Sequence, residues 1–245
     1  MAERADKQLV LVTGAGRGIG RAVAQVLAER GAQVAVNDID AGAARQTAAE
    51  IREQGGRAEP FPADVGDPAA VRTMVADAAA WGELSGLVNN AGIGGTGKTL
   101  LELSLDEWRE MMRVNLDSVF LSCREVLPYL AAAGRGSIVN ISSVSALMGV
   151  AGSTHYTAAK GGVIAFTKSL AREVAAQGVR VNAVAPGLVD TEMSRARGID
   201  HQSHLVLLDR IGCPRDVGHA VSFLMSEEAG FITGQILSPN GGAYM

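Results

Sequence analysis

A tyrosine and a lysine four residues apart are the first candidates for chemistry in this sequence. Tyr156 and Lys160 begin a stretch with helical apolar spacing at Val163, Phe166 and Leu170, so their side chains share one face of the predicted helix. A free tyrosine has a pKa of about 10, and an ammonium group one turn away lowers that pKa by stabilising the phenolate. The pair therefore suits proton transfer to or from a substrate oxygen.

A short apolar strand and a serine lie just upstream of this pair. The run from Ile138 to Ile141 is predicted as a buried strand, and Ser143 follows at its end, where it can fold back over Tyr156. A hydroxyl, an activated phenol and a lysine together are suited to acid–base catalysis. Taken alone, Tyr-x-x-x-Lys more often belongs to a half-exposed helix without function, so its weight depends on the elements that position it.

Those elements form an alternating pattern along the whole chain. Strands are predicted at 9–13, 33–37, 58–62, 84–89, 138–141, 180–184 and 235–238, and helices at 21–30, 41–54, 68–81, 104–133, from 156 onward, and at 214–225. Strand–helix alternation predicts an α/β fold with a parallel sheet covered by helices on both faces. Seven strands and a glycine-rich first turn favour an open, doubly wound Rossmann sheet over an eight-stranded barrel. We expect one domain, 1–245, with a substrate lid at 188–211.

Composition excludes several classes of function. The 245 residues carry a net charge of −4 and are 47% apolar, with no basic cluster of the kind that binds nucleic acid. The two cysteines lack the spacing of a metal site, so no metal is predicted. No uncharged stretch is apolar enough to span a membrane, and the N-terminus lacks a secretory apolar core. We expect a cytoplasmic protein that binds neither nucleic acid nor membrane.

A glycine-rich turn joins the first strand to the first helix. Gly14, Gly18 and Gly20 have the spacing Gly-x-x-x-Gly-x-Gly, and the backbone of such a turn can approach a pyrophosphate at a helix N-terminus. Asp38, at the end of the second strand, is positioned to accept hydrogen bonds from an adenosine ribose, which predicts NAD. Arg17 could meet a 2′-phosphate, but the Asp38 carboxylate would repel that group, so NADP is less favoured.

One motif indicates a different class of protein. Gly92 to Thr99 reads Gly-Ile-Gly-Gly-Thr-Gly-Lys-Thr and matches the phosphate loop of nucleotide triphosphatases. A phosphate loop must lead straight into a helix, whereas the capping-box spacing of Ser104 and Glu107 delays the next predicted helix. Nucleotide-triphosphate binding is therefore a remote alternative.

Taken together, the motifs resemble the short-chain dehydrogenase/reductase family over essentially the whole chain. The C-terminal stretch from Ile232 to Gly242 resembles the 3-oxoacyl-acyl-carrier-protein reductase branch and its secondary alcohol dehydrogenase relatives. The family implies the strand order 3-2-1-4-5-6-7. The matching pieces are Thr13-Gly14-x-x-x-Gly18-Ile19-Gly20, Asp64-Val65, Asn89-Asn90-Ala91-Gly92, Asn115, Ser143, Tyr156-x-x-x-Lys160 and Pro186-Gly187-x-x-x-Thr191.

The resemblance implies a role for each of four catalytic residues. Tyr156 would act as the acid/base, and Lys160 would lower its pKa and hold the nicotinamide ribose. Ser143, rather than Ser142, stands at the family's distance from Tyr156 and would bind the substrate oxygen. Asn115 would anchor a water that relays protons to Lys160.

The resemblance also implies contacts to the cofactor. Asp64 would meet the adenine amine and Val65 its ring, while Asn90 would help to hold the adenosine ribose. The amide of Val189 and the hydroxyl of Thr191 would hold the carboxamide. The other implied contacts are Gly14, Arg17, Gly18, Ile19, Gly20, Asp38, Ala91, Gly92, Tyr156, Lys160, Pro186 and Gly187.

The implied reaction is reversible hydride transfer between NAD(H) and a secondary alcohol or ketone. The small, mostly apolar wall from Val144 to Ser153, facing the loop from Ile93 to Thr99, favours uncharged substrates of modest size. The alternatives are an NADPH-dependent 3-oxoacyl-thioester reductase and a non-catalytic NAD-binding sensor, and the complete set of catalytic residues disfavours the sensor.

Two further expectations concern partners. An acidic carrier protein would need a basic dock, for which Arg195, Arg197 and Arg210 are candidates, although Gln177 stands where many reductases of that branch carry Arg or Lys. The family also implies a homotetramer, with the helices that begin at Ser104 and Tyr156 packed across a two-fold axis. Apolar residues of the first of these helices fit such burial: Met111, Met112, Val119 and Phe120.

Overall fold

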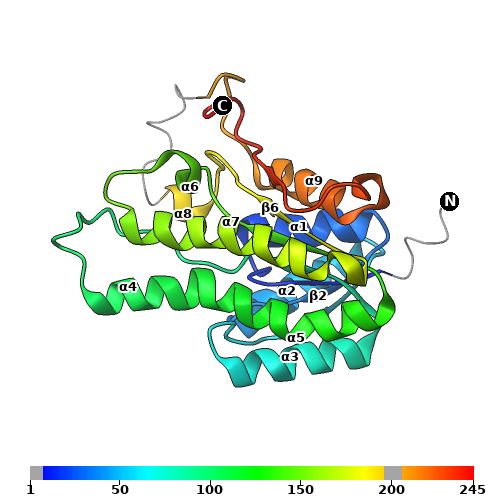
Figure 1. Ribbon diagram of the computed structural model, residues 1–245. Helices are drawn as coiled ribbons and strands as arrows, with labels where there is room; N and C mark the ends of the chain where they lie inside the picture. Colours follow the sequence, from blue (N-terminus) through cyan, green and yellow to red (C-terminus); the bar gives the residue numbers. More distant parts are fainter. Residues whose placement is uncertain (1–7, 196–205) are drawn as a thin grey trace.

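One seven-stranded parallel sheet forms the centre of the protein (Figure 1). The structure, a computed structural model, describes residues 8–195 and 206–245. The strand order is β3-β2-β1-β4-β5-β6-β7, which confirms the predicted fold class and order. The strands are β1 Leu9–Val12, β2 Gln33–Val36, β3 Arg57–Pro60, β4 Leu84–Asn89, β5 Gly136–Ile141, β6 Val179–Val184 and β7 Ile236–Leu237.

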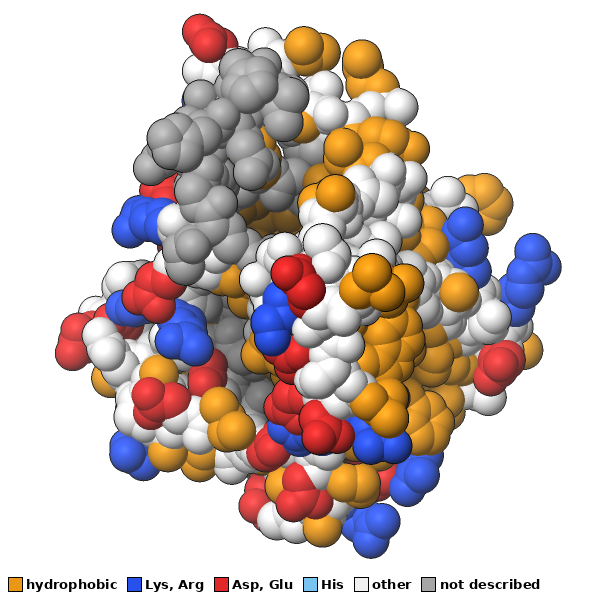
Figure 2. All heavy atoms as spheres, turned by 90° about the vertical axis from the view of Figure 1, so that its left-hand side faces the viewer, with side chains coloured by type: hydrophobic (Ala, Val, Ile, Leu, Met, Phe, Trp, Pro, Cys, Tyr) orange, Lys and Arg blue, Asp and Glu red, His pale blue; other side chains and the backbone are white. Residues whose placement is uncertain are grey.

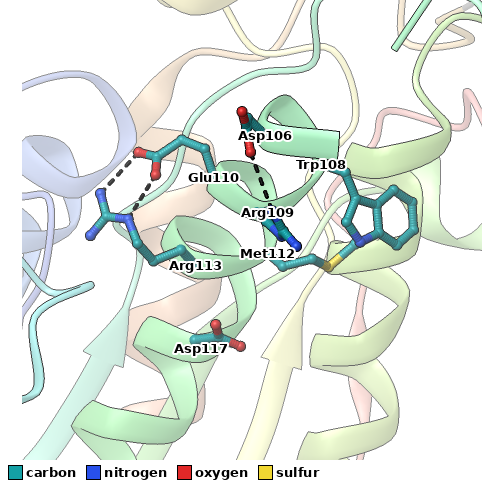
Figure 3. A pocket seen from close by; sticks show the side chains of 7 residues that line it. All are labelled: Asp106, Trp108, Arg109, Glu110, Met112, Arg113 and Asp117. Carbon is teal, nitrogen blue, oxygen red and sulfur yellow. Dashed lines mark hydrogen bonds and ion pairs between the residues drawn. The ribbon is translucent and has the colours of Figure 1, made fainter. Parts of the chain in front are cut away.

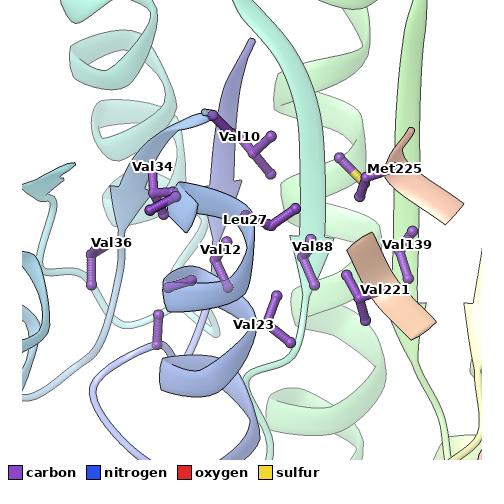
Figure 4. Close-up of a cluster of buried hydrophobic side chains, with 14 of the residues drawn as sticks. Val10, Val12, Val23, Leu27, Val34, Val36, Val88, Val139, Val221 and Met225 are labelled. Atoms are coloured by element: carbon purple, nitrogen blue, oxygen red, sulfur yellow. The ribbon is translucent and has the colours of Figure 1, made fainter. Parts of the chain in front are cut away.

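Helices cover both faces of the sheet. Three of them pack on one face, namely α1 Gly18–Glu29, α2 Ala41–Glu53 and α9 Pro214–Met225, and Figure 4 shows the core between them and the strands. Three others pack on the opposite face, namely α3 Pro68–Trp81, α5 Ser118–Ala133 and α7 Thr154–Val174. In β1, Val10 and Val12 belong to the first core, and Leu9 and Leu11 to the second. A strand buried on both faces needs such a continuous apolar run.

The predicted helix starts are confirmed where a side-chain cap marks them. Asp40 accepts hydrogen bonds from the first backbone N–H groups of α2, and Asp67 does the same for α3, which has a proline at its first turn. Ser104 and Glu107 form the expected capping box at the start of α4, Leu105–Met112. These signals are local, so the sequence alone shows them.

The long predicted helix 104–133 is interrupted. Between α4 and α5, residues Arg113–Asp117 form a π-helical turn, η2, with Asn115 buried inside it. The side-chain amide of Asn115 donates to the carbonyl of Met111 at 3.2 Å, so it competes for an acceptor of the regular helix. π-Helical turns of this kind are frequent at functional sites.

Two short helices lie in segments for which the sequence analysis predicts no helix. Helix α6, Ser145–Met148, follows β5, and α8, Glu192–Arg195, falls inside the predicted substrate lid 188–211. Residues 196–205 of that segment, including Arg197, lie outside the described residues, so the prediction of a lid is not tested there. Among the described residues, no helix is both long and apolar enough to cross a membrane.

Candidate active site

The predicted motifs gather at the carboxyl ends of adjacent strands. The glycine turn follows β1, Asn90 follows β4, Ser143 follows β5 and the Pro186–Gly187 loop follows β6. The strand order reverses between β1 and β4, which is the switch point where ligands bind in open α/β sheets. The fold therefore brings the separate motifs to one edge.

The turn after β1 has no room for side chains. Gly14 has a φ of +60°, and a Cβ atom on it would lie 2.7 Å from the Cα atom of Ala91. A Cβ on Gly20 would overlap the carbonyl oxygen of Gly14. The side-chain amide of Asn90 holds the turn by donating to the carbonyls of Thr13 and Gly14, at 3.0 and 2.9 Å. The bare backbone ahead of α1 fits a pyrophosphate.

Asn90 is thus already engaged through its amide nitrogen. Its Nδ2 atom braces the glycine turn, which leaves Oδ1 as the side-chain atom for the ribose contact that the family implies. The ribose contact itself stays a prediction. The bracing function is a second role, which the sequence did not reveal because it depends on β1 and β4 being neighbours.

Asp38 is held in place at the end of β2. Its Oδ2 atom accepts a hydrogen bond from the backbone N–H of Gly16 at 2.9 Å, and Oδ1 accepts one from that of Asp40 at 3.0 Å. Each carboxylate oxygen keeps further acceptor capacity for a hydroxyl group. A Cβ on Gly16 would lie 2.7 Å from Oδ2. Gly16, which we did not predict as a site residue, therefore lets the Asp38 carboxylate approach the turn.

Arg17 and Thr191 lie on two loops that approach each other, one after β1 and one after β6. The Nη1 atom of Arg17 lies 3.6 Å from Oε2 of Glu192 on α8. The Cγ2 atom of Thr191 lies 3.7 Å from the point where a Cβ of Gly18 would stand. The loop after β1 and the loop after β6 thus face each other closely. Arg17 pairs here with α8, and its side chain is 78% exposed.

Asp64 and Arg113 form an ion pair at the predicted adenine end. Nη1 of Arg113 lies 3.0 Å from Oδ2 of Asp64, while the Arg113 guanidinium also binds Glu110. The other Asp64 oxygen accepts from the backbone N–H of Gly66 at 2.8 Å. Val65, predicted to meet the adenine ring, is buried. Arg113 therefore holds Asp64 from the π-helical turn, a contact that sequence reasoning missed.

An exposed isoleucine beside Asp38 was also missed. Ile39 is 70% exposed although it is fully apolar, and it follows the predicted ribose-binding carboxylate directly. A large apolar side chain that is left exposed at a strand end is a candidate contact for a bound ring. The signal in the sequence was an isoleucine between two aspartates at a strand end.

Lys160 is buried on α7, one turn after Tyr156. Its side chain is 4% exposed, and Nζ donates a hydrogen bond to the carbonyl of Ile141 at 2.9 Å. Burial lowers the pKa of Lys160 to about 8 because it disfavours the charged form. An amine with a pKa of about 8 is mostly protonated at pH 7, which is compatible with the role predicted for Lys160 beside Tyr156.

The two serines after β5 have different surroundings. The hydroxyl of Ser142 is buried and donates to the carbonyl of Lys160 at 2.9 Å. The hydroxyl of Ser143 accepts from the backbone N–H of Ser145, at the longer distance of 3.2 Å. Ser142 is therefore committed to joining β5 to α7, whereas Ser143 accepts in its hydrogen bond and keeps its proton available to donate.

The side chains of Asn115 and Lys160 both end next to Gly92. A Cβ on Gly92 would lie 2.5 Å from Oδ1 of Asn115 and 3.5 Å from Nζ of Lys160. The Oδ1 atom is buried and has no hydrogen-bond partner among the described residues, while Nδ2 donates to the carbonyl of Ile93 at 3.2 Å. A buried acceptor of this kind normally binds an ordered water. The arrangement fits the water relay that the family implies.

The two predicted substrate walls touch each other. The carbonyl oxygen of Gly97, in the loop after β4, lies 2.7 Å from the point where a Cβ of Gly152 would stand. Ile93, Met148 and Val150 on these walls are apolar and partly exposed. Figure 2 views the molecule from the side on which these loops lie and shows hydrophobic side chains in a band, with basic and acidic side chains interspersed elsewhere.

The loop that resembles a phosphate loop has another structure here. It does not lead into a helix until α4 begins at Leu105. The Nζ atom of Lys98 binds Oε1 of Glu107 at 2.5 Å, and Thr99 donates through its backbone and hydroxyl to Glu102. The lysine and threonine that would hold a triphosphate and its metal are thus engaged with acidic residues.

A separate hollow lies on the outer surface of α4 and η2. It measures about 400 Å³ and holds none of the four predicted catalytic residues. Figure 3 shows Trp108 and Met112 close together at one side of it and Arg113 bonded to Glu110 at the other. We regard it as a feature of the helix surface and not of the active site. In the described part of the chain, no cluster of His, Cys, Asp and Glu is arranged to hold a metal ion.

Comparisons with known proteins agree with this geometry. Residues 14–244 match a family model described as enoyl-(acyl carrier protein) reductase. The 3-oxoacyl-(acyl-carrier-protein) reductase of Escherichia coli is 41% identical over 245 residues, with 98% of both chains covered. The cis-4-hydroxycyclohexanecarboxylate dehydrogenase of Sinomonas cyclohexanicum is 40% identical over 246 residues, covering 99% of this chain and 98% of that one. The crystal structure of a 3-oxoacyl-(acyl-carrier protein) reductase from Brucella melitensis has a TM-score of 0.92 at 38% identity, covering 98% of this chain and 93% of that one.

Proposed function

Because this chain belongs to the short-chain dehydrogenase/reductase family, we propose that it reversibly transfers a hydride between NAD(H) and a small, uncharged secondary alcohol or ketone. Bound NAD(H) would supply the hydride. The chain's own residues orient the two reactants and move the proton.

The proton transfer is assigned to four residues. Tyr156 donates a proton to the carbonyl oxygen during reduction and accepts it back during oxidation. The Lys160 ammonium, buried one turn away, lowers the pKa of the phenol, and Ser143 donates a hydrogen bond to the same substrate oxygen. A water held by the buried Oδ1 atom of Asn115 returns the proton to Lys160.

Support for NAD rather than NADP comes from Asp38. Two backbone N–H groups hold its carboxylate beside the glycine turn, where the adenosine ribose is expected. A carboxylate there accepts hydrogen bonds from ribose hydroxyls and repels a 2′-phosphate. Arg17 lies against Glu192 on the far side of the cleft, so its charge is partly cancelled there.

Support for an uncharged substrate, and against an acidic carrier protein, comes from the charges of segment 188–216. Segment 188–216 holds five acidic residues and four arginines, so it is not basic overall. Arg195 pairs with Asp190 at 2.6 Å and Arg210 pairs with Asp216 at 2.7 Å. Paired opposite charges cancel beyond a distance of about 8–10 Å in physiological salt, so they attract an acidic partner weakly. Arg197, the third candidate for a dock, lies outside the described residues.

The test compares ketones with thioesters in a single assay that follows NADH absorbance. We expect cyclohexanone to be reduced with a higher kcat/KM than acetoacetyl thioesters of coenzyme A or of carrier protein. The ring ketone 4-oxocyclohexanecarboxylate is the matched charged substrate and should be poorer than cyclohexanone, because the one described cation of the two walls, Lys98, is already paired with Glu107. A carrier-protein substrate that wins by about tenfold, roughly 1.4 kcal/mol of transition-state binding, would contradict this proposal.

The likeness to the Escherichia coli reductase supports a second candidate, a 3-oxoacyl-thioester reductase that uses NADPH. Such an enzyme should bind the carrier protein through the arginines of segment 188–216 once their acidic partners are displaced. That displacement costs little, since exposed ion pairs contribute only about 0–1 kcal/mol each. The same substrate comparison, repeated with NADPH, decides between the two candidates.

A further inference from the structure

The last residues of the chain form a compact turn that follows β7. Asn240 organises it: Nδ2 donates to Oγ of Ser238 at 2.9 Å and to the carbonyl of Tyr244 at 2.8 Å, and Oδ1 accepts from the backbone N–H of Gly242 at 2.8 Å. We call residues 239–245 the C-terminal turn. Chain ends are usually poorly ordered unless they are tied down, and these three hydrogen bonds order this one.

The C-terminal turn supports the loop that is expected to meet the nicotinamide end of the cofactor. The backbone N–H of Gly187 donates to the carbonyl of Pro239 at 3.2 Å. A Cβ on Gly187 would lie 2.7 Å from the Cα atom of Asn240, so only a glycine allows this approach. Just before these residues on the two segments, the hydroxyl of Ser238 donates to the carbonyl of Ala185 at 2.8 Å. The Pro186–Gly187 loop therefore rests directly on Asn240.

The C-terminal turn also holds the chain that returns toward α9. The backbone N–H of Leu208 donates to the carbonyl of Gly241 at 3.1 Å. Gly241 and Gly242 have φ values of +62° and +86°, and Cβ atoms on them would lie 2.6 Å from Val206 and 2.8 Å from Leu207. Figure 1 shows the red C-terminal segment beside the orange chain that precedes α9. The two glycines thus permit a contact that other residues would prevent.

A third contact reaches the substrate wall after β5. The hydroxyl of Tyr244 lies 3.4 Å from the carbonyl of Leu147 on α6, a long hydrogen bond. The cofactor loop after β6, the apolar segment Val206–Leu208 and α6 therefore meet at one turn. These three elements belong to distant parts of the sequence, and the turn is a point that contacts all of them.

We propose that the C-terminal turn is a positioning element of the active site, with Asn240 as its organising residue. It sets the Pro186–Gly187 loop at the nicotinamide end of the dinucleotide and sets Val206–Leu208 beside the substrate. Asn240 does not take part in the chemistry. The inference rests on the proposed function only in assuming that the ligand is a nicotinamide dinucleotide.

The test separates the two ends of the cofactor. ADP-ribose retains the adenosine and pyrophosphate of NADH and lacks the nicotinamide ring. In Asn240→Ala, we expect the Kd of NADH to rise by about fivefold or more, the effect of a lost hydrogen-bond network, while the Kd of ADP-ribose stays within about twofold. Calorimetric titration of the full-length protein measures both values, and the KM of the ketone should rise together with the Kd of NADH.

A matched variant controls for general loss of stability. Arg52→Ala removes a hydrogen bond to the carbonyl of Ala58 and an ion pair with Glu59 at the opposite edge of the sheet. It should leave both Kd values unchanged. If Asn240→Ala does not fold, Ser238→Ala is the second variant, because it removes one partner of Asn240 together with the hydrogen bond to Ala185. It should likewise raise the Kd of NADH more than that of ADP-ribose.

Three results would overturn the inference. In Asn240→Ala, the affinities for NADH and ADP-ribose could fall equally, or neither could fall. The third result is a wild-type protein that binds no dinucleotide. The proposed function is tested separately, by the activity of the wild type. A wild type that binds NADH and reduces no ketone contradicts that function, and the comparison of NADH with ADP-ribose still decides the role of the turn. If the wild type reduces ketones and Asn240→Ala leaves both Kd values unchanged, the inference about the C-terminal turn is wrong and the proposed function stands.

Discussion

The hydroxyl oxygen of Ser142 and the carbonyl oxygen of Lys160 lie 2.9 Å apart and share a hydrogen bond. In return, the ammonium group of Lys160 donates to the carbonyl of Ile141, also at 2.9 Å. The end of β5 and the first turns of α7 are therefore joined in both directions. Because these bonds involve only the chain itself, they can position Lys160 before any cofactor binds.

The two adjacent serines should behave differently when each is replaced by alanine. Ser143→Ala removes the hydroxyl assigned to the substrate oxygen, so kcat should fall by about 10²-fold or more with little change in Tm. Ser142→Ala removes the bond to Lys160, so the free energy of unfolding should fall by about 1 kcal/mol, and kcat should fall less than in Ser143→Ala. Steady-state kinetics and thermal unfolding of both variants measure this, and the reverse pattern would exchange their roles.

Tyr156→Phe keeps the aromatic ring and removes the proton donor. We expect the rate of ketone reduction to fall by about 10²–10⁴-fold, the usual contribution of general acid–base catalysis. The Kd of NADH should change little, because the hydroxyl serves mainly the chemistry. A rate within a few-fold of the wild type, measured at saturating NADH, would show that another group moves the proton.

Burial of Lys160 should make the stability of the protein depend on pH. The pKa of Lys160 is lowered from 10.5 to about 8 by burial, so between these values the unfolded chain binds more protons than the folded protein. Stability rises with pH wherever the unfolded state binds more protons, by at most about 1.4 kcal/mol per pH unit for one group. The cost of the buried charge is thus fully present below pH 8 and disappears toward pH 10.5.

Lys160→Met removes this titrating group. The free energy of unfolding of the wild type relative to this variant should therefore rise as the pH increases from about 8 to about 10, measured by urea unfolding at each pH. Lys168→Met replaces an exposed lysine on the same helix and should show no such trend. If the difference in the free energy of unfolding between the wild type and Lys160→Met does not change with pH, the amine stays protonated in the folded protein over this whole range.

Asp38→Ser should change the cofactor preference. The substitution removes the charge that repels a 2′-phosphate and also the acceptors for the ribose hydroxyls. The ratio of kcat/KM for NADPH to that for NADH should therefore rise by about tenfold or more. Asp77→Ser, an exposed aspartate on α3, is the control and should leave the ratio unchanged. A wild type that uses NADPH better than NADH would show that Arg17 outweighs Asp38.

The homotetramer remains a prediction, and the structure narrows the residues that could support it. Of the four apolar residues proposed for the interface, Met111 and Val119 are buried inside the chain. Phe120 is 46% exposed on α5, and Met112 lies with Trp108 on the surface of α4 (Figure 3). Phe120→Glu should therefore reduce the mass measured by light scattering at micromolar concentration. Leu101→Glu, in a loop and 98% exposed, should not, and a monomeric wild type would contradict the prediction.

Much of the fold was predictable because its signals are local. Apolar runs marked the strands, and Asp67 with Pro68 and Ser104 with Glu107 marked helix starts, since a cap involves residues only two or three positions apart. The order of the strands came from resemblance to a family and not from the pattern itself. Spacing alone indicated Tyr156, Lys160 and Ser143, whereas Asn115 came only from the resemblance, and the roles of all four in this chain remain to be measured.

The tertiary structure decided the features that depend on contacts between distant segments. The residues around Asn115 in the sequence do not predict a π-helical turn. In the structure, the amide of Asn115 donates to the carbonyl of Ile93, 22 positions away, and a contact over that distance leaves no local signal. Arg17 faces Glu192 because the loops after β1 and β6 approach each other. The contact of Asn240 with Gly187 likewise joins the ends of two strands.

The amino-acid sequence by itself determined the class of fold and the set of chemical groups available at one edge of the sheet. Only the packed chain decided which of those groups are already engaged: the Nδ2 atom of Asn90 with the glycine turn, the hydroxyl of Ser142 with Lys160, and Arg113 with Asp64. The physical reason is that periodicity and capping act over one or two helical turns. A hydrogen bond between distant segments depends instead on where the whole core places their backbones.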